Sequence, residues 1–101
     1  MFHPRLNAGE EGAAIPAEIF PVTELPEFTF VLHRSINIPG TWVTSELSSG
    51  MQFSEVSQYK KAQAFLISQR IERYGLQHIR KVIERNGGKP SFQKIPILFV
   101  S

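Results

Sequence analysis

The chain has 101 residues, the usual size of one domain, and 42% of them are hydrophobic, which is enough for one modest core. Charged residues make up only 20% of the chain, so wholesale disorder is not expected. The sequence has no cysteine, which excludes disulfides, thiolate metal sites and a thiol nucleophile and suits a cytosolic protein held together by packing alone.

Two further features indicate a cytoplasmic protein with no membrane partner. The N-terminal stretch MFHPRLNAGEEG lacks the basic start and the apolar run of a signal peptide. The longest strongly apolar run, IPILFV at residues 95–100, is far shorter than a membrane span.

The net charge of +2 hides a division between the two halves of the chain. Residues 1–56 carry two basic and seven acidic side chains, a net charge of −5, whereas residues 57–101 carry nine basic and two acidic side chains, a net charge of +7. Such asymmetry can mark a surface for nucleic acid or for an acidic protein. The alternative is an acidic sheet that faces a basic helix within one domain.

Residues 1–26 contain four prolines and no sustained hydrophobic period, so we expect an extended arm. Several of its side chains are too apolar for a free tail, so the arm should pack along the domain or onto a partner. They are Ile15, Ile19, Phe20, Val22 and Leu25.

Three segments after the arm have strand character. Residues 27–34 alternate apolar and polar side chains, and residues 41–47 are rich in β-branched and aromatic residues. Pro39–Gly40 lies in the turn between them, and Gly50 can form a short hairpin loop before a third strand at residues 51–54. These segments predict a three-stranded antiparallel meander.

A helix should follow, capped by Ser54 or Ser57 and running to about Tyr74. Gly75 either ends this helix or is a weak point inside a longer one, because an apolar stripe continues beyond it until Asn86–Gly88 stops the pattern. The last segment, residues 91–101, reads as a strand that Pro96 confines to a sheet edge. The fold class is therefore α+β, with an extended arm at residues 1–26 and a single domain at residues 27–101: a three-stranded antiparallel meander packed by one long or broken helix, then a C-terminal edge strand.

The sequence offers no constellation for catalysis. Its histidines, His3, His33 and His78, lack the spacing of metal ligands, and no serine elbow or close pair of carboxylates is present. The stretch GGKPS at residues 87–91 ends a helix and does not form a phosphate loop. We therefore expect a protein that is not an enzyme and has no metal and no cofactor.

A row of cations along the predicted helix is the main candidate for a binding surface. Like charges three or four residues apart, as at Arg70 and Arg73, cost about 0.2–0.5 kcal/mol per pair, so a helix selected only for stability would avoid them. The target would be a phosphate backbone or an acidic protein surface; the alternative is an ordinary solvated helix face. The candidate residues are Lys60, Lys61, Arg70, Arg73, Arg80, Lys81 and Arg85.

A second set of residues fits a protein-binding adaptor or an inhibitor of a host or phage protein, docking through the arm or through the C-terminal edge strand. An apolar edge strand also favours a homodimer. Trp42 would either pack in the core or stack a partner group, and Tyr59 and Tyr74 read as core residues with a wet hydroxyl. The candidate docking residues are Ile19, Phe20, Trp42, Ile97 and Phe99.

Two resemblances accompany these patterns. The segments TWVTSELSSGMQF (41–53) and AQAFLISQRIERYGLQHIRKVIERNG (62–87) resemble small phage- and prophage-encoded proteins of unknown function that carry a hairpin followed by a helix. This resemblance implies an accessory protein that binds a host or phage macromolecule. The segments PEFTFVL (26–32) and YKKAQAFLISQRI (59–71) resemble the double-stranded-RNA-binding domain, which implies that Lys60 and Lys61 would contact phosphates, although the family's leading helix has no counterpart in the sequence.

Overall fold

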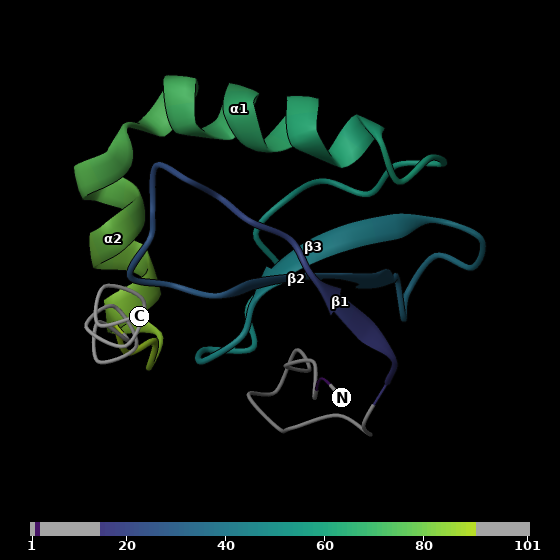
Figure 1. Ribbon diagram of the computed structural model, residues 1–101, viewed down its shortest axis with the longest axis horizontal. Coiled ribbons are helices and arrows are strands. Elements are labelled where there is room, and N and C mark those ends of the chain that lie inside the picture. Colours follow the sequence, from purple (N-terminus) through teal and green to yellow (C-terminus); the bar gives the residue numbers. More distant parts are fainter. Residues whose placement is uncertain (1, 3–14, 91–101) are drawn as a thin grey trace, which may run out of the picture.

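The computed structural model describes residues 2 and 15–90, which form a three-stranded antiparallel sheet and two helices (Figure 1). The predicted α+β class is confirmed. The elements in chain order are β1 (Ala17–Ile19), β2 (Phe30–Arg34), β3 (Trp42–Glu46), α1 (Ala62–Tyr74) and α2 (Leu76–Arg85).

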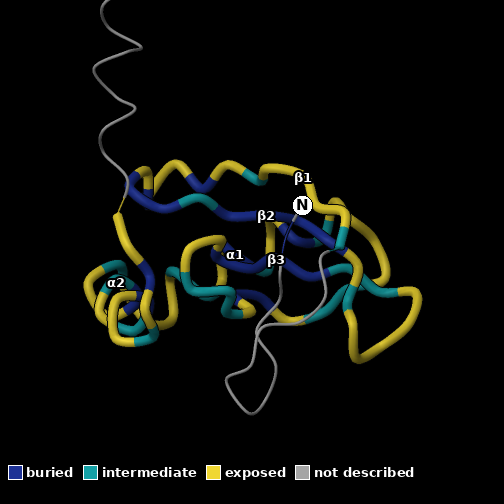
Figure 2. The backbone as a smooth tube through the Cα atoms, turned by 90° about the horizontal axis from the view of Figure 1, so that it is seen from below, coloured by how far each residue is buried: buried dark blue, intermediate teal, exposed yellow. Residues whose placement is uncertain are grey.

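The sheet has the order β1-β2-β3, so β2 is its central strand. Glu18 pairs with Leu32 on one side of β2, and Val31 pairs with Ser45 on the other. The first four residues of β2 are buried, whereas all of β1 is exposed (Figure 2). The alternating pattern at residues 27–34 therefore marked a strand that is covered on both faces.

The hydrophobic core lies between one face of the sheet, the loop before β2 and the two helices. The rings of Phe30 and Phe53 meet at its centre, with their centroids 4.7 Å apart. The helices contribute Ile67 from α1 and both Ile79 and Ile83 from α2. The full cluster comprises Val22, Leu25, Phe28, Phe30, Phe53, Ile67, Ile79 and Ile83.

The third strand of the sheet comes from the expected arm, and the strand predicted at residues 51–54 is wrong. In that segment only Gln52 forms a bridge, to Ser45, and the backbone N–H groups of Phe53 and Ser54 both donate to the Thr44 carbonyl. Ser54 turns inward there, so the ladder cannot continue. Within the arm, residues 15–26 pack along the domain, and residues 3–14 lie outside the described part of the chain.

The predicted helix start at Ser54 or Ser57 is also wrong, because both hydroxyls have other partners and α1 begins at Ala62. The Ser57 hydroxyl donates to the Tyr59 carbonyl, at 2.7 Å. The Ser54 hydroxyl donates to Oε1 of Gln63, a side chain in the first turn of α1 that is 0% exposed.

Gln63 joins α1 to the sheet and to the loop before the helix. Its Oε1 also accepts a hydrogen bond from the Thr44 hydroxyl, at 2.8 Å. Its Nε2 lies 3.0 Å from the carbonyl oxygens of Trp42 and Glu55 and 2.8 Å from the Ser57 hydroxyl. This amide therefore fixes the start of the helix, which no side-chain cap holds.

Gly75 separates the two helices. Its φ of +81° and ψ of 149° are compatible with neither helix, and this geometry turns α2 sharply away from α1 (Figure 1). The helix stop at Asn86–Gly88 is confirmed, with the N–H of Gly88 donating to the Ile83 carbonyl at 2.8 Å. The predicted strand at residues 91–101 lies outside the described residues.

Candidate binding site at the helical elbow

Two of the seven predicted cations are held in ion pairs within the chain. Arg80 Nε lies 2.6 Å from Oε2 of the buried Glu27, and its Nη2 donates to the Glu24 carbonyl at 3.3 Å. Burial raises the pKa of Glu27, but the hydrogen bond and charge of Arg80, with a backbone hydrogen bond, outweigh burial and hold this pKa below its ordinary value. Arg80 thus joins α2 to the loop before β2.

Lys60 is the second of these cations. Its Nζ lies 2.5 Å from Oε1 of Glu18 on β1 and 4.8 Å from the centre of the Trp42 ring. The guanidinium of Arg34 lies 4.0 Å from the same ring. The half-buried Trp42 therefore already contacts two cations of its own chain, and the positive charge of Lys60 is compensated by the carboxylate of Glu18.

Arg70 and Arg73 gather around Tyr74, the last residue of α1. Their guanidinium carbons lie 5.5 and 5.6 Å from the centre of the Tyr74 ring. His78, one turn into α2, stacks on the same ring with centroids 5.9 Å apart. We call these four residues the elbow cluster.

The expectation that Tyr59 and Tyr74 belong to the core is wrong, because 65% and 44% of their surface is exposed. For Tyr74 the reason is its position: α1 ends there, and Gly75 carries the chain away before the ring can be covered.

The two arginines of the elbow cluster have no ion-pair partner among the described residues, where the ion pairs are those of Lys60 and Arg80. Glu55 shares a shallow hollow of 80 Å³ with Arg70 and Arg73 but pairs with neither. Two positive charges therefore lie within 5.6 Å of the centre of one exposed aromatic ring.

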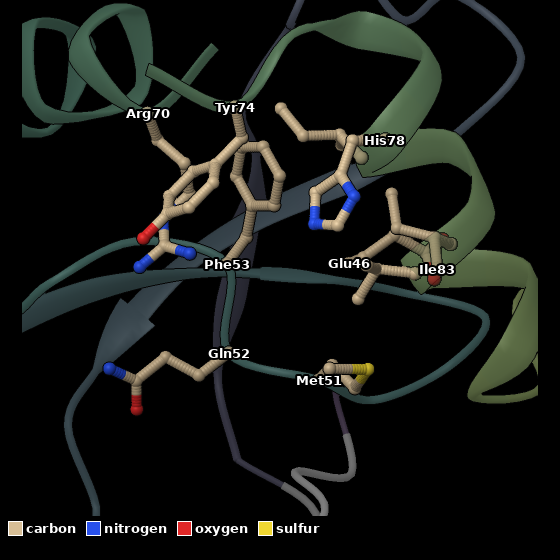
Figure 3. Close-up of a pocket in the computed structure, with 10 residues that line it drawn as sticks. Glu46, Met51, Gln52, Phe53, Arg70, Tyr74, His78 and Ile83 are labelled. Atoms are coloured by element: carbon tan, nitrogen blue, oxygen red, sulfur yellow. The ribbon is translucent and has the colours of Figure 1, made fainter.

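An apolar groove with a cavity volume of 170 Å³ opens beside the elbow cluster (Figure 3). Its walls are formed by Met51 and Phe53 from the loop after β3 and by Ile79, Val82 and Ile83 from α2. In Figure 3, Arg70 and Tyr74 lie at one end of the groove, and Glu46 and Ile83 lie at the other.

Glu46 is 1% exposed, and both of its carboxylate oxygens already accept hydrogen bonds from within the chain. It accepts hydrogen bonds from the backbone N–H groups of Ser48 and Ser49, at 3.0 and 2.8 Å, and from the Ser48 hydroxyl. The groove therefore has an acidic end, held by the turn after β3, and a basic end at the elbow cluster.

The remaining predicted site residues do not join this site. Lys61, just before α1, and Lys81 and Arg85, on α2, are exposed and do not line the groove. Ile19 is 65% exposed on β1, whereas Phe20 is half-buried and packs against the core. Ile97 and Phe99 lie outside the described residues.

His33 and Ser45 form a buried pair on the opposite face of the sheet. His33 Nε2 lies 2.7 Å from the Ser45 hydroxyl and Nδ1 lies 2.8 Å from the Arg34 carbonyl, so the neutral ring accepts from the first and donates to the second. The hollow beside them holds only 30 Å³, about the volume of one water, and leaves no space for a substrate.

The sequence did not predict the groove, and it did not predict Tyr74 and His78 as site residues. One sequence pattern could have indicated this site, because Arg70, Tyr74 and His78 follow one another at four-residue spacing across Gly75. Among the described residues, no three histidine or acidic side chains gather as a metal site. None of the helices in that part of the chain has the length and apolar character to cross a bilayer.

Comparison of the chain with family models, with curated proteins and with solved structures gives no match. The resemblances to phage-encoded proteins and to the double-stranded-RNA-binding domain therefore stay predictions.

Proposed function

We propose that the chain is a non-catalytic binding module that contacts an anionic macromolecule through Arg70, Arg73 and Tyr74. One observation carries this proposal: two guanidinium groups lie within 5.6 Å of the centre of one exposed ring, and no described carboxylate pairs with either. The groove and the buried His33–Ser45 pair add no catalytic arrangement to it.

An anion bound at Arg70 and Arg73 would relieve a repulsion that is present in the free chain. Arg70 and Arg73 repel one another across one helical turn, which costs about 0.2–0.5 kcal/mol. The face of Tyr74 attracts both cations and limits their freedom, so less conformational entropy is lost when they bind. A carboxylate or phosphate placed between them would remove the repulsion and gain charge-assisted hydrogen bonds.

The proposal is tested by fluorescence anisotropy with labelled polyglutamate, duplex DNA and duplex RNA. The salt concentration should be about 10 mM, where the Debye length is about 30 Å. We expect one or more of these polyanions to bind. We expect the double variant Arg70→Gln/Arg73→Gln to bind about tenfold more weakly, because two charge-assisted contacts are lost.

Lys61→Gln is the control for net charge, because it removes one charge just before the start of α1, about 13 Å from Arg70 at 1.5 Å per residue. Its affinity should change by less than about twofold, which is the effect of net charge alone. Absence of binding to all three polyanions, or an equal loss in Lys61→Gln, would contradict the proposal.

The exposed Ile19 supports a second function, protein binding or self-association through the edge of the sheet. It lies on β1, the edge strand, with 65% of its surface exposed. Sedimentation velocity over a dilution series should reveal a dimer, and Ile19→Lys should shift the dimer to a monomer. A parent chain that stays monomeric at high concentration would exclude self-association through this edge.

A further inference from the structure

We propose that the anionic partner is an acidic peptide segment of a protein, anchored by one bulky apolar side chain in the groove beside the elbow cluster. This inference rests on the proposed function and names its partner. It is carried by the size of the groove, by the chemistry of its walls and by the charges at its two ends.

The size of the groove fits one side chain. Its volume of 170 Å³ is close to the ~150 Å³ apolar cavity that binds benzene, and it is well below the ~300 Å³ of a small ligand pocket. The walls are Phe53, Ile79, Val82 and Ile83, so a leucine or phenylalanine side chain would bury its surface against apolar partners.

The charges at the two ends set the direction of the segment. At the basic end Arg70 lies beside Tyr74, and at the other end lies the carboxylate of Glu46 (Figure 3). An acidic residue next to the anchor would meet Arg70 and avoid Glu46. A peptide with carboxylates on one side of an apolar anchor therefore matches the groove.

A nucleic acid matches this arrangement less well. A base placed in the groove would bring most of its polar edges against the apolar side chains of the walls, where burial of unpaired polar groups is costly. A phosphate backbone is contacted by a row of cations, and two members of the predicted row, Lys60 and Arg80, are paired with Glu18 and Glu27. The observations therefore favour a protein segment.

The test is a titration of the ¹⁵N-labelled chain with synthetic heptapeptides, followed by NMR. The first peptide has a central phenylalanine flanked by glutamates, the second replaces this phenylalanine by alanine, and the third replaces the glutamates by lysines. We expect the first peptide to shift the amide signals of Phe53, Tyr74, His78 and Val82. Loss of the anchor should weaken binding about tenfold, and loss of the acidic residues should abolish it.

Variants of the chain locate the contact. Arg70→Gln should weaken the phenylalanine and alanine peptides alike, because both keep the carboxylates. Val82→Glu places a carboxylate in the groove and should remove the preference for phenylalanine, with circular dichroism confirming that this variant is folded. Lys61→Gln is the control and should bind as the parent chain does.

The outcomes separate the two proposals. If both acidic peptides bind equally and depend on Arg70, the anchor in the groove is refuted and the proposed function stands. If a duplex RNA or DNA binds the elbow cluster more tightly than the phenylalanine peptide, the protein partner is refuted. If no peptide and no nucleic acid shifts the signals of the elbow cluster, both proposals fail.

Discussion

Two buried polar residues, Gln63 and His33, hold parts of the described fold together through their hydrogen bonds. Gln63 is 0% exposed, and its amide contacts residues from β3 and from the loop between β3 and α1. His33 is 3% exposed, and both of its ring nitrogens have partners. Buried polar groups of this kind cost little while they are hydrogen-bonded and much when a partner is removed.

Gln63→Ala should destabilise the chain by about 3 kcal/mol. The substitution leaves a cavity and removes partners from the buried hydroxyls of Thr44 and Ser54, each of which costs about 1–3 kcal/mol when unsatisfied. Urea denaturation measures the free energy of unfolding. Gln69→Ala, on the exposed side of the same helix, is the control and should change it by less than about 0.5 kcal/mol.

His33 should make the fold sensitive to mild acid. Burial lowers the pKa of His33 below its ordinary value of 6.5, and the hydrogen bond to the Arg34 carbonyl opposes this only in part. Below about pH 6.5 the unfolded chain therefore binds a proton that the folded chain does not, so the free energy of unfolding falls with decreasing pH.

Urea denaturation between about pH 7 and about pH 5 measures this effect. His33→Gln should show a flatter pH profile, whereas Gln69→Ala, which removes no titratable group, should keep the profile of the parent chain. A parent chain that is equally stable at both ends of this range would contradict the prediction. Glu27, whose pKa is also lowered, changes the free energy of unfolding only at lower pH, below the ordinary pKa value of 4.5.

At the scale of elements, local patterns predicted the parts of the fold that local interactions decide. The strand at residues 30–34 follows from alternation, the strand at residues 42–46 from β-branched and aromatic residues, and the stop after Arg85 from glycine. At Gly75 the sequence left open whether the helix ends or continues, and the structure has two helices there. The start of α1 could not be predicted, because Ser54 bonds to a glutamine nine residues away instead of capping the helix. The three-residue β1 was missed because only pairing with β2 makes it a strand.

Gly75→Ala should destabilise the chain by about 1–3 kcal/mol, because a φ of +81° with a ψ of 149° is a conformation that L-residues avoid. The cause is the backbone alone, since a Cβ at this position would meet nothing within 4 Å. Thermal unfolding of Gly75→Ala beside Gln77→Ala, an exposed neighbour in α2, measures the difference. A Gly75→Ala variant as stable as the parent chain would contradict the prediction that an L-residue is strained at this position.

At the scale of the molecule, the charge division has a structural counterpart. Both described ion pairs join the acidic first half to the basic second half: Glu18 to Lys60 and Glu27 to Arg80. The sequence predicted the cations but could not separate paired from unpaired ones. It could not predict the groove either, because the groove forms only where the loop after β3 meets the elbow between the helices.

Arg80→Met should destabilise the fold by about 2–3 kcal/mol, because it leaves the buried Glu27 without its counter-ion. This is somewhat below the ~3–5 kcal/mol of a fully buried pair, since Arg80 is partly exposed. Arg85→Met removes the same charge one turn further along α2 and should have an effect below about 0.5 kcal/mol. Equal effects in the two variants, measured by urea denaturation, would show that the pair does not stabilise the fold.

The origin of β1 has a consequence for trimming the chain. A deletion of residues 1–20 removes β1, the strand that pairs with one side of β2. The freed edge would present the unpaired backbone of a strand whose first four residues are buried, FVLH. Such an edge favours pairing between chains, so a protein without residues 1–20 should precipitate or form fibrils under conditions in which the 101-residue chain stays in solution.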